Sequence, residues 1–157
     1  MNKKGWITGS GREIIFKDIL IEIERYVADG GKIFIGSDSQ LCNNTCIFAT
    51  AICLHGAKGS KGGKYFFKRF KDKGPQYSNL KLRIMSEVTH TLDVAMDLMG
   101  MFPDSDIEVH VDIGRGPRSK TSGYIDHIQG WAQSTGLICK VKPNAWASAS
   151  VADKHTK

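Results

Sequence analysis

The chain has 157 residues, of which 41% are hydrophobic and 24% charged, and its formal net charge is +6. This length suits one domain over residues 1–157 with a sizeable core, and this composition is that of an ordinary globular protein. No apolar run is long enough to cross a bilayer, and the first six residues lack the apolar core of a signal peptide. We therefore expect a cytoplasmic protein without a membrane partner.

The positive charge is concentrated in two parts of the chain. Residues 56–83 contain nine Lys and Arg residues against Asp72 alone, and a second basic region begins at Arg115. Two basic regions on one domain suit a polyanion such as nucleic acid, although the same charges also serve as a solubilising surface.

The first third of the chain predicts a helix followed by a buried strand. Residues 1–12 are rich in Gly and Lys and read as a loosely ordered lead-in. Apolar residues at helical spacing predict a helix over 14–28, and Gly30 suits its end. The apolar run 33–35 predicts a strand, and Asp38 lies on it or just past its end.

Two more strands and a long helix follow. Residues 46–55 and 65–70 predict strands, joined by a glycine-rich loop that lacks the phosphate-loop spacing and has Tyr65 where Ser or Thr is needed. With the strand before Asp38 they form an antiparallel meander. A helix over 79–99 carries Glu87 at the margin of its apolar stripe, where a glutamate is expected to reach solvent.

The last third of the chain alternates strands and helices. Residues 107–114 alternate in polarity as a strand does, with Asp112 near its end. A helix over 119–135, a strand over 137–141 and a short helix containing Asp153 complete the chain. The resulting order, α then β-β-β-α-β-α-β-α, predicts an α/β protein with a mixed sheet and flanking helices.

Three segments carry a resemblance to a known family. They are Ile35–Gln40 (IGSDSQ), His110–Gly114 (HVDIG), and the stretch from Lys140 to Lys154 with KVKP at its start and VADK at its end. The chain resembles the ribonuclease H-like superfamily and, within it, the YkuK-type family first described as a domain of unknown function. The resemblance implies a ribonuclease H-like fold with an extra N-terminal helix.

The resemblance also implies a set of catalytic metal ligands, because four acidic residues fall where the superfamily keeps its ligands: Asp38, Glu87, Asp112 and Asp153. Two Mg²⁺ or Mn²⁺ ions activate water and stabilise the leaving oxygen in phosphodiester hydrolysis, and such ions prefer carboxylate oxygens. Asp38 is expected to bridge both ions, Glu87 and Asp153 to hold one each, and Asp112 to complete the set. Taken alone, the stretch around Asp38 favours a turn-capping role, in which the carboxylate bonds to nearby backbone N–H groups.

Further residues are candidates for contacts with the nucleic acid or for proton transfer. His155 lies close to Asp153 and is either a proton-transfer group or an exposed tail residue, the second being the simpler interpretation. Candidates for contacts with the nucleic-acid backbone are Ser39, Gln40, Arg115, Arg118, Lys142 and Lys154.

Three hypotheses for function follow. The first is a metal-dependent nuclease acting on RNA, RNA–DNA hybrid or branched DNA. The second is a nucleic-acid-binding module of the same fold with little or no turnover, and the third is a metal-binding domain of a protein assembly. Metal-dependent cleavage separates the first from the second, and salt-dependent binding of nucleic acid separates the second from the third.

Overall fold

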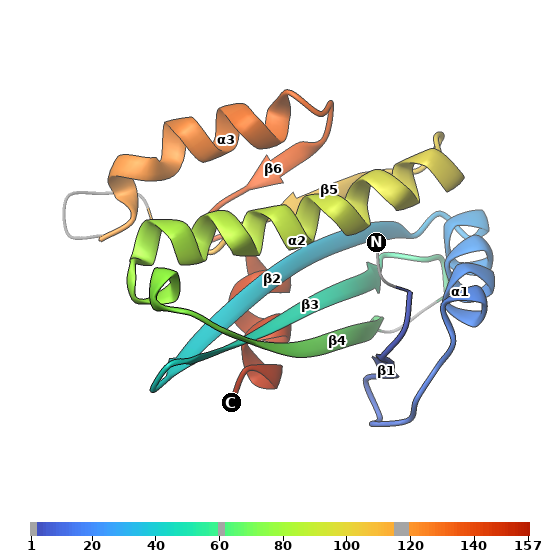
Figure 1. Cartoon of the computed structure of the whole chain (residues 1–157). Coiled ribbons are helices and arrows are strands. Elements are labelled where there is room, and N and C mark those ends of the chain that lie inside the picture. The colour runs from blue at the N-terminus through green and yellow to red at the C-terminus, as the bar shows by residue number, and fades with distance from the viewer. Residues whose placement is uncertain (1–2, 60–61, 115–119) are drawn as a thin grey trace.

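A six-stranded mixed sheet forms the centre of the protein, with the strand order β1-β4-β3-β2-β5-β6 (Figure 1). The computed structural model describes residues 3–59, 62–114 and 120–157. Neighbouring strands are antiparallel from β1 to β2, whereas β5 and β6 continue the sheet in parallel with β2. The strands are β1 (Trp6–Thr8), β2 (Lys32–Cys42), β3 (Thr45–His55), β4 (Lys64–Lys73), β5 (Ile107–His110) and β6 (Ile138–Lys140).

Helices cover both faces of this sheet. One face packs against α1 (Phe16–Ala28), α2 (Leu80–Met101) and α3 (Ile125–Gln133), and the other packs against two short C-terminal turns, η3 (Ala147–Val151) and η4 (Ala152–His155) (Figure 1). Short 3-10 turns precede α2 and α3, namely η1 (Pro75–Ser78) and η2 (Ser122–Tyr124). This arrangement confirms the predicted α/β, ribonuclease H-like fold class.

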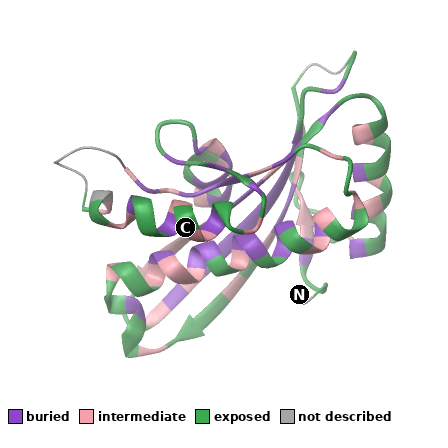
Figure 2. Cartoon of the chain, turned by 90° about the horizontal axis from the view of Figure 1, so that it is seen from above, coloured by how far each residue is buried: buried purple, intermediate pink, exposed green. Residues whose placement is uncertain are grey.

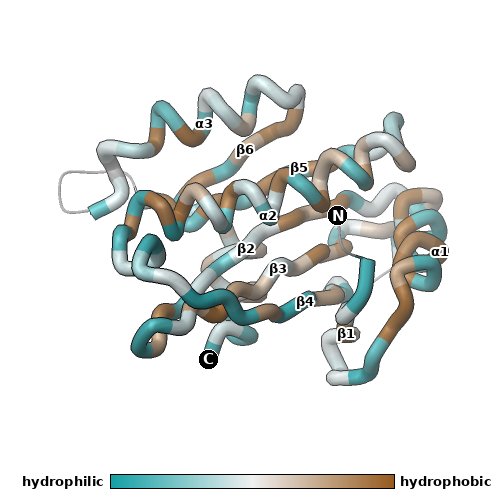
Figure 3. The backbone as a smooth tube through the Cα atoms, in the orientation of Figure 1, coloured by the Kyte–Doolittle hydropathy of each residue, from teal (hydrophilic) through white to brown (hydrophobic). Residues whose placement is uncertain are grey.

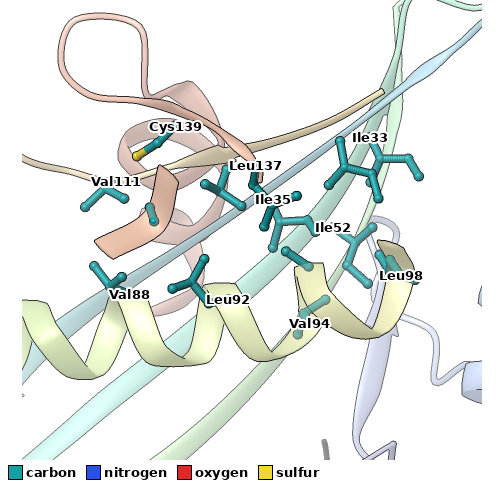
Figure 4. Close-up of a cluster of buried hydrophobic side chains, with 14 of the residues drawn as sticks. Ile33, Ile35, Ile52, Val88, Leu92, Val94, Leu98, Val111, Leu137 and Cys139 are labelled. Carbon is teal, nitrogen blue, oxygen red and sulfur yellow. The ribbon is translucent and has the colours of Figure 1, made fainter. Parts of the chain in front are cut away.

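The larger part of the core lies between α2 and the central strands. Figure 4 shows Val88, Leu92 and Leu98 of α2 facing Ile33 and Ile52 of the sheet. The buried side of α2 and its exposed opposite side are visible in Figure 2, and the matching alternation of polar and apolar residues appears in Figure 3. The helical spacing of apolar residues therefore identified the helix correctly, because that spacing gives one face for the sheet.

A chain of buried hydroxyl groups joins β2, β3 and α2. The Ser37 and Thr50 hydroxyls lie 2.8 Å apart on neighbouring strands, and Thr91 of α2 donates to Ser37 over 2.8 Å. Ser37 and Thr50 are also direct partners in the register of the two strands. Each hydroxyl thus has a partner inside the core, where an unpaired one would be costly.

Gly36 allows the C-terminal turns to approach the sheet closely. A Cβ atom at this position would lie 2.5 Å from the backbone nitrogen of Ser148 and 2.7 Å from the carbonyl carbon of Ala147. Real Cβ atoms do not approach so closely, so only glycine permits η3 to lie against β2 in this way.

The N-terminal segment differs from the prediction of a loosely ordered lead-in over residues 1–12. Residues 6–8 form β1, which pairs with Phe66–Lys68 of β4. Trp6 is 1% exposed, and its ring centroid lies 6.2 Å from that of Phe16 in a tilted arrangement. The prediction was wrong here because a three-residue strand is too short to show a periodic pattern, while its one aromatic side chain supplies enough buried area to fix it.

Strand ends also differ from their predicted positions. β2 continues to Cys42, so Asp38 lies within the strand, and β5 ends at His110, so Asp112 follows it. The predicted start of the third helix at residue 119 lies outside the described residues. Within the described ranges, no helix combines the length and apolar character needed to span a membrane.

Candidate metal and nucleic-acid site

Asp38 lies in the middle of β2 and faces the C-terminal turns. Side chains alternate along a strand, and its neighbours Ser37 and Ser39 bond to α2, so Asp38 points to the opposite face. There it is 9% exposed and hydrogen-bonded to the carboxyl group of Asp153 in η4. The central strand thus places this acid beside the last turn of the chain.

The pKa values of Asp38 and Asp153 are shifted in opposite directions. Burial, and then the hydrogen bond to Asp153, raise the pKa of Asp38 from 3.8 to about 7. The ion pair with Lys157 and the hydrogen bond from Asp38 instead lower the pKa of Asp153, which is the more exposed partner. The shared proton therefore belongs to Asp38, while Asp153 stays ionised.

Glu87 is buried on the face of α2 that packs on the sheet, which corrects the expectation that it reaches solvent. It is 6% exposed, and its carboxylate accepts a hydrogen bond from the hydroxyl of Ser39. Burial, and then the charge of Asp38, raise its pKa well above the ordinary value. A polar side chain at the margin of an apolar stripe can be buried when a hydroxyl group of the sheet forms a hydrogen bond with it.

Asp112 follows the end of β5 and forms an ion pair with Lys142. Its Oδ1 lies 3.0 Å from the lysine Nζ, and the Asp112 side chain is 23% exposed against 50% for Lys142. Both residues stand just beyond the neighbouring parallel strands β5 and β6, so the sheet brings them together. Lys142 was expected to contact phosphate, and in this structure it neutralises a candidate metal ligand.

Asp153 has a lysine partner that was missed in the sequence. The Nζ of Lys157 lies 3.0 Å from its Oδ2. The spacing of four residues was the available signal, because side chains four apart meet on a helical turn. Two of the four acids, Asp112 and Asp153, thus form ion pairs with lysines.

The four carboxyl groups come from four separate elements and lie within electrostatic reach of one another. The charges of Asp112 and Asp153 help to raise the pKa of Asp38, and those of Asp38 and Asp112 help to raise that of Glu87. In the described part of the chain, no three Asp, Glu, His or Cys side chains are already gathered closely enough to hold a metal ion. The donor type fits Mg²⁺ or Mn²⁺, since all four groups offer carboxylate oxygens, while protons and lysines now balance their charge.

The remaining candidates for nucleic-acid contact are placed differently. Ser39 bonds to Glu87 and so orients a carboxylate. Gln40 is half-buried on the Asp38 face, and Lys154 is exposed beside Asp153. Arg115 and Arg118 lie outside the described residues.

His155 belongs to a packed cluster rather than to an exposed tail. Its ring stacks on Phe67 with centroids 3.5 Å apart, and its Nε2 lies 3.1 Å from the hydroxyl of Tyr65. Burial lowers its pKa, so the ring is neutral near pH 7. These contacts hold η4 on β4 and thereby help to position Asp153.

His110 similarly attaches η3 to the sheet. It is 1% exposed, the backbone N–H of Ala147 donates to its Nδ1 over 3.0 Å, and its Nε2 lies 3.1 Å from a carboxylate oxygen of Glu108. Its carbonyl accepts a 2.6 Å bond from the Ser148 hydroxyl. This histidine has a structural partner on each side and fixes the turn that leads to Asp153.

We expect the metal-free protein to lose stability as the pH rises from 3.8 to about 7, the range over which Asp38 changes its ionisation. A folded-state pKa above the unfolded value favours folding below the unfolded pKa, and this contribution is lost as the pH rises through the folded one. Relative to wild type, Asp38→Asn should therefore gain roughly 4 kcal/mol of unfolding free energy across this range. Urea denaturation in EDTA measures the difference.

Asp104→Asn is the matched control, because Asp104 is exposed and lies before the start of β5, at the opposite end of that strand from Asp112. Its unfolding free energy should follow that of wild type at every pH. Parallel curves for Asp38→Asn and wild type would contradict the shared proton.

Comparison with known proteins identifies the class to which this fold belongs. Residues 14–157 match the family described as Ribonuclease H-like, and the chain belongs to that family. Among curated proteins it is similar to the uncharacterized protein YkuK of Bacillus subtilis (strain 168), with 26% identity over 167 residues and 94% of each chain covered. No solved structure matches the chain. The resemblance inferred from the three sequence segments is confirmed.

Proposed function

We propose that this protein is a metal-dependent nuclease that hydrolyses phosphodiester bonds in RNA, RNA–DNA hybrid or branched DNA. The observation that carries the proposal is that Glu87, Asp112 and Asp153 lie within electrostatic reach of Asp38 on a ribonuclease H-like fold. Two buried acids with raised pKa values beside two further acids support a functional role, because groups perturbed by burial and by like charges cluster at functional sites.

In this proposal Asp38, Glu87, Asp112 and Asp153 supply the oxygen ligands for Mg²⁺ or Mn²⁺. When bound, such ions activate water and stabilise the leaving oxygen. Asp38 and Glu87 would release their protons on metal binding, which couples affinity to pH. Ser39 would keep the Glu87 carboxylate oriented through its hydrogen bond.

Lys142 and Lys157 balance the negative charge of two of the proposed ligands. Lys142 and Lys157 each lie 3.0 Å from a carboxylate oxygen, and both are at least half exposed. Each can swing into solvent and leave its carboxylate to a metal ion, after which its ammonium group is available to a phosphate. Two of the four proposed ligands, Asp112 and Asp153, are thus neutralised by lysines in this structure.

The second candidate is a nucleic-acid-binding module of the same fold with little or no turnover. The observation that favours it is that two of the four acids form ion pairs with lysines, while in the described part of the chain no three Asp, Glu, His or Cys side chains are gathered as a metal site. Both candidates predict binding of nucleic acid, so cleavage decides between them.

The deciding experiment measures Mn²⁺ binding to the wild-type protein by calorimetry, followed by cleavage of a panel of RNA, hybrid and junction substrates. We expect Mn²⁺ binding with release of protons, and cutting that stops in EDTA. Nucleic-acid binding without Mn²⁺ binding or cutting would favour the binding module.

A further inference from the structure

The Asp38 face of the sheet continues beyond the carboxyl groups as an open cationic surface. In the register of β2, β3 and β4, residues that share this face form three rows across the strands. Adjacent rows are about 6.8 Å apart, twice the rise per residue of an antiparallel strand. The rows are Asp38–Ala49–Arg69, Gln40–Ile47–Lys71 and Cys42–Thr45–Lys73.

The C-terminal turns reach only the first of these rows. Asp153 bonds to Asp38 there, and the carbonyl of Lys157 accepts a 3.5 Å bond from Arg69. The hairpin formed by β2 and β3 extends past η3 and η4 (Figure 1). The sheet beside this part of the hairpin has a shallow depression lined by Cys42, Thr45, Ile47, Lys71, Asp72 and Lys73.

The chemistry of the two outer rows suits a polyanionic strand. Lys71 and Lys73 are exposed and, within the described residues, neither has an ion-pair partner. Ile47 offers an apolar surface in the centre of its row.

We propose that this platform, the rows Gln40–Ile47–Lys71 and Cys42–Thr45–Lys73 together with Arg69, binds one single-stranded segment of nucleic acid and leads it to Asp38. The inference rests on the proposed function and names the strand that the site receives. A single strand fits better than a duplex because the cations follow one strand, β4, and so form one line of phosphate contacts. Arg69 ends this line in the row of Asp38.

The test measures binding of a short fluorescein-labelled single-stranded RNA by anisotropy in EDTA at several salt concentrations. Lys71→Gln/Lys73→Gln should weaken binding about 25-fold at about 0.1 M salt and reduce the slope of log K against log salt by about 1.4, since each phosphate contact contributes about 0.7 to that slope for single strands. Lys17→Gln/Arg25→Gln, on the exposed side of α1, removes the same charge and should leave affinity and slope at the wild-type values.

Three results would overturn the platform: no binding of single strands by wild type, an unchanged slope in the Lys71/Lys73 variant, or an equal loss in the α1 control. A duplex of the same sequence should bind more weakly than the single strand, and the reverse order would assign the surface to a duplex instead. Because metal is absent, this outcome is independent of cleavage, so the platform and the nuclease can fail separately. Thermal unfolding of both variants verifies that they are folded.

Discussion

Replacing Asp38 by asparagine is expected to abolish metal-dependent cleavage, lowering the rate by at least about a thousandfold. Of the four proposed ligands, Asp38 is the one that is both buried and bonded to a second acid, so its loss removes the central ligand of the set. A metal ion contributes several kcal/mol to stabilising a phosphoryl transition state, and about 4 kcal/mol corresponds to this rate factor. Cleavage of the best substrate in saturating Mn²⁺ measures the effect.

The same variant should lose most of its Mn²⁺ binding in calorimetry while retaining its affinity for nucleic acid in EDTA. Asp104→Asn removes an exposed acid at the opposite end of β5 from Asp112, serves as the control and should cleave like wild type. Cleavage retained in Asp38→Asn would refute the mechanism. A loss of nucleic-acid binding together with cleavage would instead indicate that the substitution disturbs the fold.

Replacing Gly36 by alanine should destabilise the protein by about 3 kcal/mol, an effect at the upper end for an overpacked core. The added Cβ would meet the backbone of Ser148 at 2.5 Å, and neither the central strand nor η3 can move without breaking other contacts. Because η3 runs directly into η4, the displaced turn would also carry Asp153 away from Asp38. Cleavage should therefore fall even where the variant remains folded.

Urea denaturation of Gly36→Ala against Gly100→Ala tests this expectation. Gly100 lies in α2 with no atom within 4 Å of an added Cβ, so alanine there should stabilise the helix by about 1 kcal/mol. Equal stability of the two variants would show that the sheet and the C-terminal turns are not in rigid contact.

Periodicity in the sequence predicted the order of the main elements because each one buries a single face. The helix containing Glu87 and the alternating strand before Asp112 both had this signature, and both exist. The length of β2 was not predicted, since residues beyond Ile35 are polar and their partners lie on other elements. Local patterns cannot show that Ser37 meets Thr50 across the hairpin.

Contacts between segments that are distant in sequence also limited the prediction of the candidate site. The acidic positions followed from resemblance, and the burial of Glu87 was missed because it depends on a contact between α2 and Ser39 of β2, which is distant in sequence. The ion pair between Asp112 and Lys142 joins residues that are far apart in sequence and meet only because β5 and β6 are neighbours. The pair of Asp153 and Lys157 was accessible from spacing and was overlooked.

The buried hydroxyl chain of Ser37, Thr50 and Thr91 gives the long hairpin a single alignment. A slip of β3 by two residues would preserve the inward and outward alternation of both strands and so escape correction by hydrophobicity alone. It would, however, set Ser37 opposite Phe48 or Ile52 and leave hydroxyls unsatisfied in the core, at about 1–3 kcal/mol each. These three small side chains therefore make misaligned hairpins less stable than the native one. In such hairpins Asp38 would lie opposite the wrong part of β3.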